Sequence, residues 1–193
     1  MLSSFFIIFA APFVKSLKPF YMKENMTMSM NPLVNFLKKS PKEFTKADIM
    51  KYVEENEIRM INFHYVAGDG RVKTLGFVLH SREYMDQILS NGERVDGSNI
   101  FPAFIHAGSS DLYVIPRFST AFINPFAEIP TLSFLCSYYN KDGQPLENSP
   151  EYILRKAVKS FNDVTGLYFQ AMGELEYYVI GDAEDLYTIP DQK

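Results

Sequence analysis

Two carboxylates that lie two residues apart are the feature of this sequence that most clearly suggests chemistry. Glu174 and Glu176 belong to the stretch MGELEYYVIGD, residues 172–182, whose aromatic and β-branched neighbours are typical of a buried strand. Side chains at this spacing project from one face of a strand about 7 Å apart, so the two charges repel unless a cation relieves them. Because hard cations prefer oxygen ligands, the pair suggests a magnesium or manganese site. The plain alternative is a solvent-exposed pair on an antiparallel strand.

Two further acids lie in loops. Asp96 is part of RVDGSN, and Asp111 follows two serines. An aspartate beside glycine or serine commonly forms a turn or caps its own backbone, and this is the default interpretation of both residues. The histidines are isolated from one another and lack the spacing of metal ligands, so none is predicted to be catalytic. They are His64, His80 and His106.

Composition indicates a globular protein with a substantial core. The chain has 193 residues, of which 47% are hydrophobic and 22% are charged, with a formal net charge of -4. Lys and Arg are interspersed with Asp and Glu, so no basic stripe predicts a nucleic-acid partner. The single Cys136 and the lack of Cys/His clusters favour a reducing, cytoplasmic location and argue against a zinc site.

The N-terminal segment is apolar but lacks the pattern of a fold. Residues 2–14, LSSFFIIFAAPFV, have no positive residue before them and are too short to span a bilayer, so no membrane partner is predicted. A secretion signal is one interpretation. We favour a translation start assigned upstream of the natural one, because several methionines precede the first patterned segment. Residues 1–44 are therefore expected to lie outside the fold.

The middle of the chain predicts an α+β unit. Residues 45–57 form a helix capped by Thr45, and residues 59–66 and 72–79 form a hairpin around an Asp69-Gly70 turn. Residues 81–92 form a second helix capped by Ser81. Strands are expected at 112–118, 120–126 and 131–139. Helices would cover one face of a mixed sheet, and we place this domain at residues 45–130.

The C-terminal part predicts a helix and then a strand. Ser149 and Pro150 mark the start of a helix that ends near Gly166. Its expected core face consists of Ile153, Leu154, Ala157, Val158 and Phe161. Residues 167–181 would form the strand, with Leu175 and Tyr177 buried and both glutamates on the open face. Residues 131–193 would thus begin a second unit that the chain ends before completing.

In order, these segments resemble the N-terminal part of glutamine synthetase. The similarity is carried by TKADIMKYVEENE, INFHYV, DGSN, SSDLYVIP, STAFINPF, SPEYILRKAV and GELEYY. Seven short matches in the same order are far more specific than any one of them. The resemblance implies a β-grasp domain followed by a truncated start, helix and strand, of an α+β catalytic domain.

The resemblance also implies an activity and roles for the four acids. Glutamine synthetase is an ATP-dependent ligase that joins ammonia to glutamate through γ-glutamyl phosphate. Glu174 and Glu176 would be ligands of two different Mg²⁺ or Mn²⁺ ions. Asp96 would help bind ammonium and take its proton, with Asp111 as a second acid beside it. The ATP site would lie beyond Lys193, so ATP enters as a substrate held by residues that this sequence does not include.

The family's assembly implies a shared site. Its members are homo-oligomeric rings, dodecamers of two hexamers, in which this domain completes the active site of the neighbouring subunit. Asp96 should then lie far from Glu174 and Glu176 within one chain, and this chain alone should be inactive. Two alternatives stay open: a ligase that joins glutamate to another amine, and a short non-catalytic protein that docks with full-length rings. A truncated gene model and a natural short protein are equally compatible with the sequence.

Overall fold

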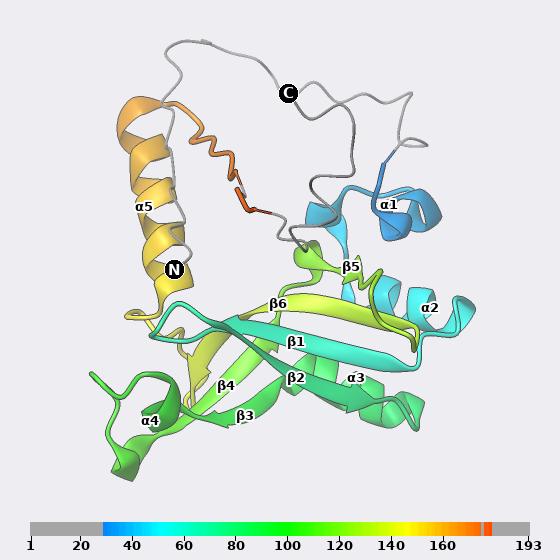
Figure 1. The fold of residues 1–193 in the computed structure, drawn as a ribbon, viewed down its shortest axis with the longest axis horizontal. Helices are drawn as coiled ribbons and strands as arrows, with labels where there is room; N and C mark the ends of the chain where they lie inside the picture. The colour runs from blue at the N-terminus through cyan, green and yellow to red at the C-terminus, as the bar shows by residue number, and fades with distance from the viewer. Residues whose placement is uncertain (1–28, 175, 179–193) are drawn as a thin grey trace, which may run out of the picture. The chain divides into compact units, whose positions relative to one another are not determined.

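The computed structural model describes residues 29–174 and 176–178 and contains an α+β fold around one mixed sheet (Figure 1). The sheet order is β2-β1-β6-β4-β3, and β5 also pairs with β6. The strands are β1 Met60–Val66, β2 Val72–Val78, β3 Glu93–Asp96, β4 Asp111–Pro116, β5 Phe122–Ile123 and β6 Thr131–Asn140. The α-helices are α1 Pro32–Leu37, α2 Lys46–Glu55, α3 Arg82–Asn91, α4 Gly97–Ile100 and α5 Pro150–Thr165. By its contacts the chain divides into two units, residues 18–159 and residues 1–17 with 160–193.

The predicted hairpin is confirmed as β1 and β2. The two strands are antiparallel, with Met60 opposite Val78 and Val66 opposite Val72. Gly70 adopts a φ of 78° in the connecting turn, a conformation that glycine reaches without steric cost. Alternate residues of β1 are buried, as the alternation of its sequence predicts.

The central strand is β6, which pairs in parallel with β1 and antiparallel with β4 and β5. Residues on both faces of β6 are buried, including Leu132, Ser133 and Phe134 at 0% exposure. A strand buried on both faces gives a nearly continuous apolar run without alternation, so its sequence does not reveal its neighbours. The predicted domain boundary at residue 130 is therefore wrong, because β6 belongs to the same sheet as β1.

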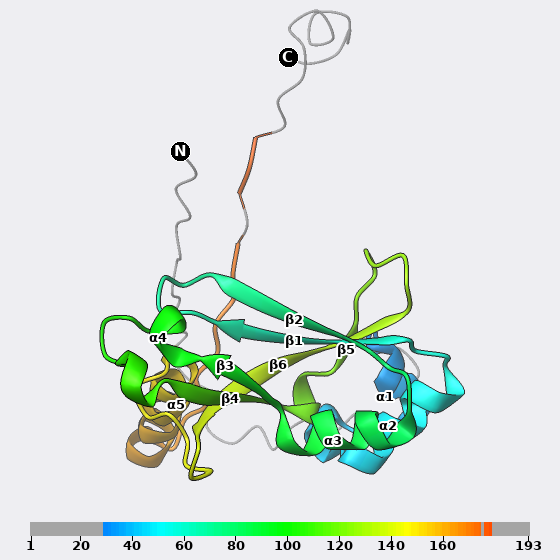
Figure 2. The same cartoon turned by 90° about the horizontal axis from the view of Figure 1, so that it is seen from below.

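Helices α2 and α3 cover one face of the sheet, together with α1 (Figure 2). Thr45 caps α2 by accepting a hydrogen bond from the backbone N–H of Asp48, and the Asp48 carboxylate accepts one from the backbone N–H of Thr45. Ser81 caps α3 in a similar way, by accepting from the N–H of Tyr84. Both predicted helices and their caps are thus confirmed.

The fold begins earlier than expected. Asn31 caps α1, and Leu33 and Val34 of this helix are buried in the core at 0% and 7% exposure. Phe44, also assigned to the extension, is 7% exposed. The prediction that residues 1–44 lie outside the fold is therefore wrong from α1 onward, because a six-residue helix is too short to show a helical period. Residues 1–28 lie outside the described residues.

The C-terminal helix forms as predicted, but its apolar side chains are not buried. Ile153 is 55% exposed and Leu154 62%, and α5 has no buried residue. Beyond α5, residues 167–174 and 176–178 have no regular secondary structure, so the expected strand is absent from them. Tyr177, expected to be buried, is 70% exposed, whereas Leu175 lies outside the described residues. A strand needs partners for its backbone groups, and a local pattern does not supply them.

Candidate functional site

Asp96 occupies the junction between β3 and α4, where it is both the last strand residue and the N-cap of the helix. Its Oδ1 accepts hydrogen bonds from the backbone N–H of Ser98 at 2.9 Å and from Ser98 Oγ at 2.6 Å. Its Oδ2 accepts one from Asn99 Nδ2 at 2.7 Å. Both oxygens of an exposed carboxylate are therefore held in a fixed orientation by the residues that follow it.

These donors also tune the charge of Asp96. The hydroxyl of Ser98 lowers the pKa of this carboxyl most strongly, and slight desolvation partly opposes the effect. The backbone N–H groups of Ser98 and Asn99 and the side chain of Ser110 lower the pKa further. Asp96 is thus a negatively charged carboxylate with a fixed orientation at neutral pH.

Asp111 lies beside Asp96 because β3 and β4 are antiparallel partners. The register places Asp96 directly opposite Asp111, so their Cα atoms are about 5 Å apart. Nη1 of Arg94, two residues before Asp96, lies 3.3 Å from Oδ1 of Asp111. Both acids were predicted from the sequence but Arg94 was not, although an arginine two residues from an aspartate on one strand was a usable signal. The guanidinium offsets part of the repulsion between the two carboxylates.

Gly97 makes this arrangement sterically possible. A Cβ atom at this position would lie 2.8 Å from both Cδ1 of Leu112 and the carbonyl oxygen of Ser110. The Gly97 N–H donates to that same carbonyl oxygen at 2.7 Å. The loop that carries Asp96 is therefore held against the start of β4 by a contact that only glycine permits.

Glu174 and Glu176 form no comparable site within the described residues. Both are exposed and lie in a segment without secondary structure. No group of three or more His, Cys, Asp or Glu side chains suited to a metal ion occurs in the described part of the chain. The carboxylate oxygens have the right chemistry for Mg²⁺ or Mn²⁺, but two residues alone do not make a metal centre.

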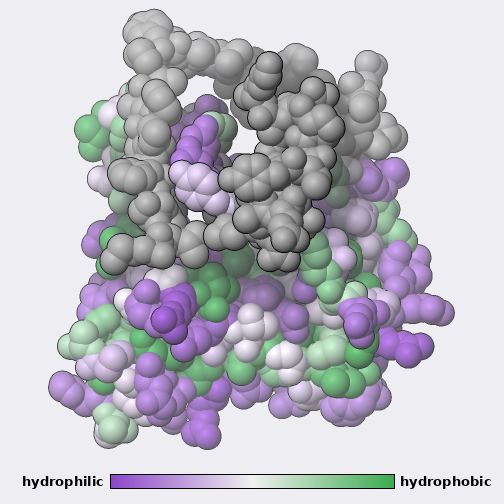
Figure 3. Space-filling model, in the orientation of Figure 1, coloured by the Kyte–Doolittle hydropathy of each residue, from purple (hydrophilic) through white to green (hydrophobic). Residues whose placement is uncertain are grey.

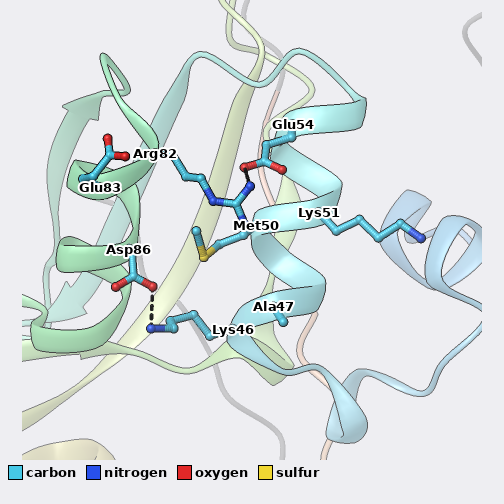
Figure 4. A pocket seen from close by; sticks show the side chains of 8 residues that line it. All are labelled: Lys46, Ala47, Met50, Lys51, Glu54, Arg82, Glu83 and Asp86. Carbon is cyan, nitrogen blue, oxygen red and sulfur yellow. Dashed lines mark ion pairs between the residues drawn. The ribbon is translucent and has the colours of Figure 1, made fainter.

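A shallow hollow of about 520 Å³ lies between α2 and α3 (Figure 4). Two ion pairs span it, Lys46 Nζ to Asp86 Oδ1 at 2.6 Å and Arg82 Nη1 to Glu54 Oε1 at 2.8 Å. Because each cation already has an anionic partner, the hollow offers little unpaired charge to a ligand. Its side chains connect the two helices, and this hollow was not predicted from the sequence. Elsewhere, the face in Figure 3 mixes hydrophilic and hydrophobic residues.

No helix in the described residues is long and apolar enough to cross a membrane. Among the histidines, Nδ1 of His64 lies 2.8 Å from Oγ1 of Thr74, and the ring of His80 stacks on Tyr84. Neither contact is part of the acidic pair.

Comparison with known proteins finds a family that part of this chain resembles. The family model described as "Glutamine synthetase, beta-Grasp domain" matches residues 57–141. A glutamine synthetase of Staphylococcus aureus is 28% identical over 138 residues, which are 70% of this chain and 30% of that protein. A 3-hydroxylaminophenol mutase of Cupriavidus pinatubonensis is 30% identical over 122 residues, covering 63% of this chain and 25% of the mutase.

Solved structures share the fold. The Plasmodium falciparum glutamine synthetase matches with a TM-score of 0.54 and 17% identity, over 63% of this chain and 23% of that one. A structure named "GmaS/ADP complex" matches with a TM-score of 0.52 and 12% identity, over 60% of this chain and 25% of that one. The chain spans about a third of the length of the glutamine synthetases it matches.

The matched region begins just before β1 and ends just after β6, so it contains both Asp96 and Asp111. It also contains the mixed sheet in full. The curated glutamine synthetases and the shared fold are consistent with this match. Residues 57–141 therefore match the β-grasp domain of the glutamine synthetase family.

Proposed function

We propose that this chain supplies the β-grasp domain of an ATP-dependent ligase that forms glutamine from glutamate and ammonia through γ-glutamyl phosphate. The observation that supports the proposal is the opposition of Asp96 and Asp111 across β3 and β4, inside the region that matches the family. Two acids on an exposed strand end, one of them held by three hydrogen bonds, suit the binding of a small cation such as ammonium.

The electrostatics of Asp96 favour cation binding over simple proton abstraction. Its lowered pKa keeps the carboxylate charged but makes it a weak base. In the proposed reaction the nitrogen of ammonia bonds to the acyl carbon of γ-glutamyl phosphate, and phosphate leaves with the electron pair of the broken C–O bond. Asp96 would bind the ammonium ion, hold its nitrogen in place and accept one of its protons, which frees the lone pair that attacks. After the C–N bond forms, the nitrogen would lose a second proton to the departing phosphate. Asp111 adds negative potential, which Arg94 moderates.

The remaining components are part of the same proposal. Glu174 and Glu176 are the residues of this chain that would each ligate one divalent ion, Mg²⁺ or Mn²⁺, and such ions would stabilise charge on the transferred phosphoryl group. ATP would be bound by residues outside this sequence. The active protein would be a cytoplasmic ring of identical subunits, a dodecamer as in the family, with sites shared between neighbours.

A domain exchange tests the proposal. Residues 57–141 would replace the matching segment of the Staphylococcus aureus glutamine synthetase, and glutamine formation would be measured. We expect an active chimera in which Asp96→Asn lowers kcat by about 100-fold or more, because the cation-binding charge is lost. The matched control is Asp69→Asn in the β1–β2 turn, where an amide oxygen still accepts from the Arg71 N–H.

Assembly must be measured beside activity. A chimera with the parent enzyme's mass that forms no glutamine, or an active chimera that is indifferent to Asp96→Asn, would contradict the proposal. Loss of activity in the Asp69→Asn control as well would point to a general folding effect instead.

A ligase for another amine is the second candidate. The observation in its favour is that a mutase is as similar to this chain as the glutamine synthetases are, so this level of identity covers more than one reaction. Supplying the chimera with ammonia and small alkylamines in competition, and identifying the γ-glutamyl products by mass, separates the two. A product made mainly from an alkylamine favours the second candidate.

A further inference from the structure

The two edges of the sheet differ in how they are protected. β3, at one edge, is only four residues long and carries Glu93, Arg94 and Asp96. Short, charged edge strands discourage pairing with another chain. β2, at the other edge, has seven residues and pairs with β1 alone among the described strands. Lys73 is its one charged residue, so β2 offers a nearly unprotected row of backbone donors and acceptors.

The side chains of β2 are self-complementary about its centre. Val72 and Val78 are 62% and 64% exposed and lie on the same face, because they are an even number of residues apart. They are equally distant from Leu75. We infer that β2 pairs antiparallel with β2 of a second copy of this chain, with Leu75 opposite its counterpart and Val72 opposite Val78 of the partner subunit.

Other registers of this strand pair would bury less apolar surface. In an antiparallel pair, opposite residues share a face, so the register can shift only in steps that keep Val72 and Val78 on that face. The nearest shift in either direction separates both valines of each chain from the valines of the other chain. In the centred register Lys73 is opposite Phe77 of the partner subunit, so no like charges oppose each other. The area buried by one pair of strands is small, so we expect a weak, concentration-dependent dimer contact.

A charge exchange tests both the contact and its register. Sedimentation velocity of the full chain should show self-association that Val72→Lys and Val78→Glu each weaken by about tenfold, since each replaces two apolar pairs per dimer. The double variant should restore the wild-type association, because the introduced lysine of each chain then opposes the introduced glutamate of the other. Val164→Lys is the matched control, an 82% exposed valine on α5 that should leave association unchanged.

A cross-linking experiment gives an independent readout. Differently tagged Val72→Cys and Val78→Cys chains, mixed and oxidised, should form a mixed disulfide, whereas either variant alone should not; the native Cys136 is buried. Association that neither single charge variant weakens, or that the double variant fails to restore, would overturn the inference. A chain that is monomeric at every concentration, or a lack of mixed disulfide, would do the same.

Discussion

The β3–β4 acids and the glutamate pair after α5 are both acidic, but they differ in how firmly the surrounding structure holds them. Asp96 is fixed by three hydrogen bonds from the loop that follows it and lies opposite Asp111 across two paired strands. Glu174 and Glu176 lie in an exposed segment without secondary structure. The first pair is organised by its own domain, whereas the described residues give the second pair no such framework.

The same contrast holds for apolar side chains. Phe134 on β6 is fully buried, whereas Phe161 on α5 is 38% exposed. The sheet region thus contains both the pattern and the partners that the pattern requires. The C-terminal region contains the pattern of an amphipathic helix, but the apolar face of that helix is exposed. Four measurements test this difference between the two regions.

The largest difference should come from truncating these two phenylalanines. Phe134→Ala should lower the free energy of unfolding by about 3–5 kcal/mol, because it empties a fully buried site in contact with Phe63 and Phe118. Phe161→Ala should cost less than about 1 kcal/mol, since its main aromatic neighbour is Phe169 at a 6.0 Å ring separation. Urea denaturation of both variants measures this. Equal costs would show that α5 packs as firmly as the sheet.

Glycine substitutions should give the next largest contrast. Gly92 has a φ of 67°, and a Cβ there would collide with the carbonyl oxygen of Val114 on β4. Gly92→Ala should therefore destabilise the fold by about 2–3 kcal/mol. Gly173→Ala, in the C-terminal segment, meets nothing within 4 Å and should leave stability unchanged. Thermal unfolding compares the two, and a tolerated Gly92→Ala would mean that β3 and β4 can separate without cost.

A third contrast concerns the acids themselves. Asp96→Ala removes the N-cap of α4 and should cost about 1 kcal/mol, whereas Asp96→Asn keeps an acceptor oxygen and should cost less. Glu174→Ala should not change stability, because that side chain is exposed and outside any regular element. Chemical denaturation of the three variants measures the order. If Glu174→Ala destabilised the protein, Glu174 would make a stabilising contact that is not among the described ones.

Much of the fold could be predicted because it is encoded locally. The Thr45 and Ser81 caps, the Gly70 turn and the alternation of β1 are each set by residues within a few positions of one another. Leu33 and Phe44 were missed because their burial depends on distant partners and not on a local period. The boundary at residue 130 failed for the same reason: pairing between β1 and β6 joins residues about 70 positions apart.

In the candidate site, too, the local features could be predicted and those that depend on distant partners could not. DGS indicates a turn in which Asp96 caps the next residues, and the structure has that turn. The opposition of Asp96 and Asp111, and the ion pair from Arg94, depend on the register of β3 and β4, which the loop between them does not reveal. The roles of all four acids in catalysis and metal binding remain predictions.

The smallest expected effect is a pH dependence centred on His64. Burial lowers the pKa of this imidazole, and its Nε2 is buried without a hydrogen-bond partner among the described residues. Thr74 on β2 contacts Nδ1, and Phe122 on β5 stacks on the ring, so neither neighbour offers a negative charge to the protonated form. The unfolded chain therefore binds this proton more readily than the folded chain does. Stability from this residue is present above the unfolded pKa of about 6.5 and falls as pH drops below it.

Thermal unfolding between about pH 7.5 and 5 should show a loss of a few degrees that His64→Gln reduces and that His106→Gln, at an exposed position, does not. An unchanged slope in His64→Gln would mean that the hairpin accommodates the charged ring, and that the β1–β2 side of the sheet is less firmly closed than its burial implies.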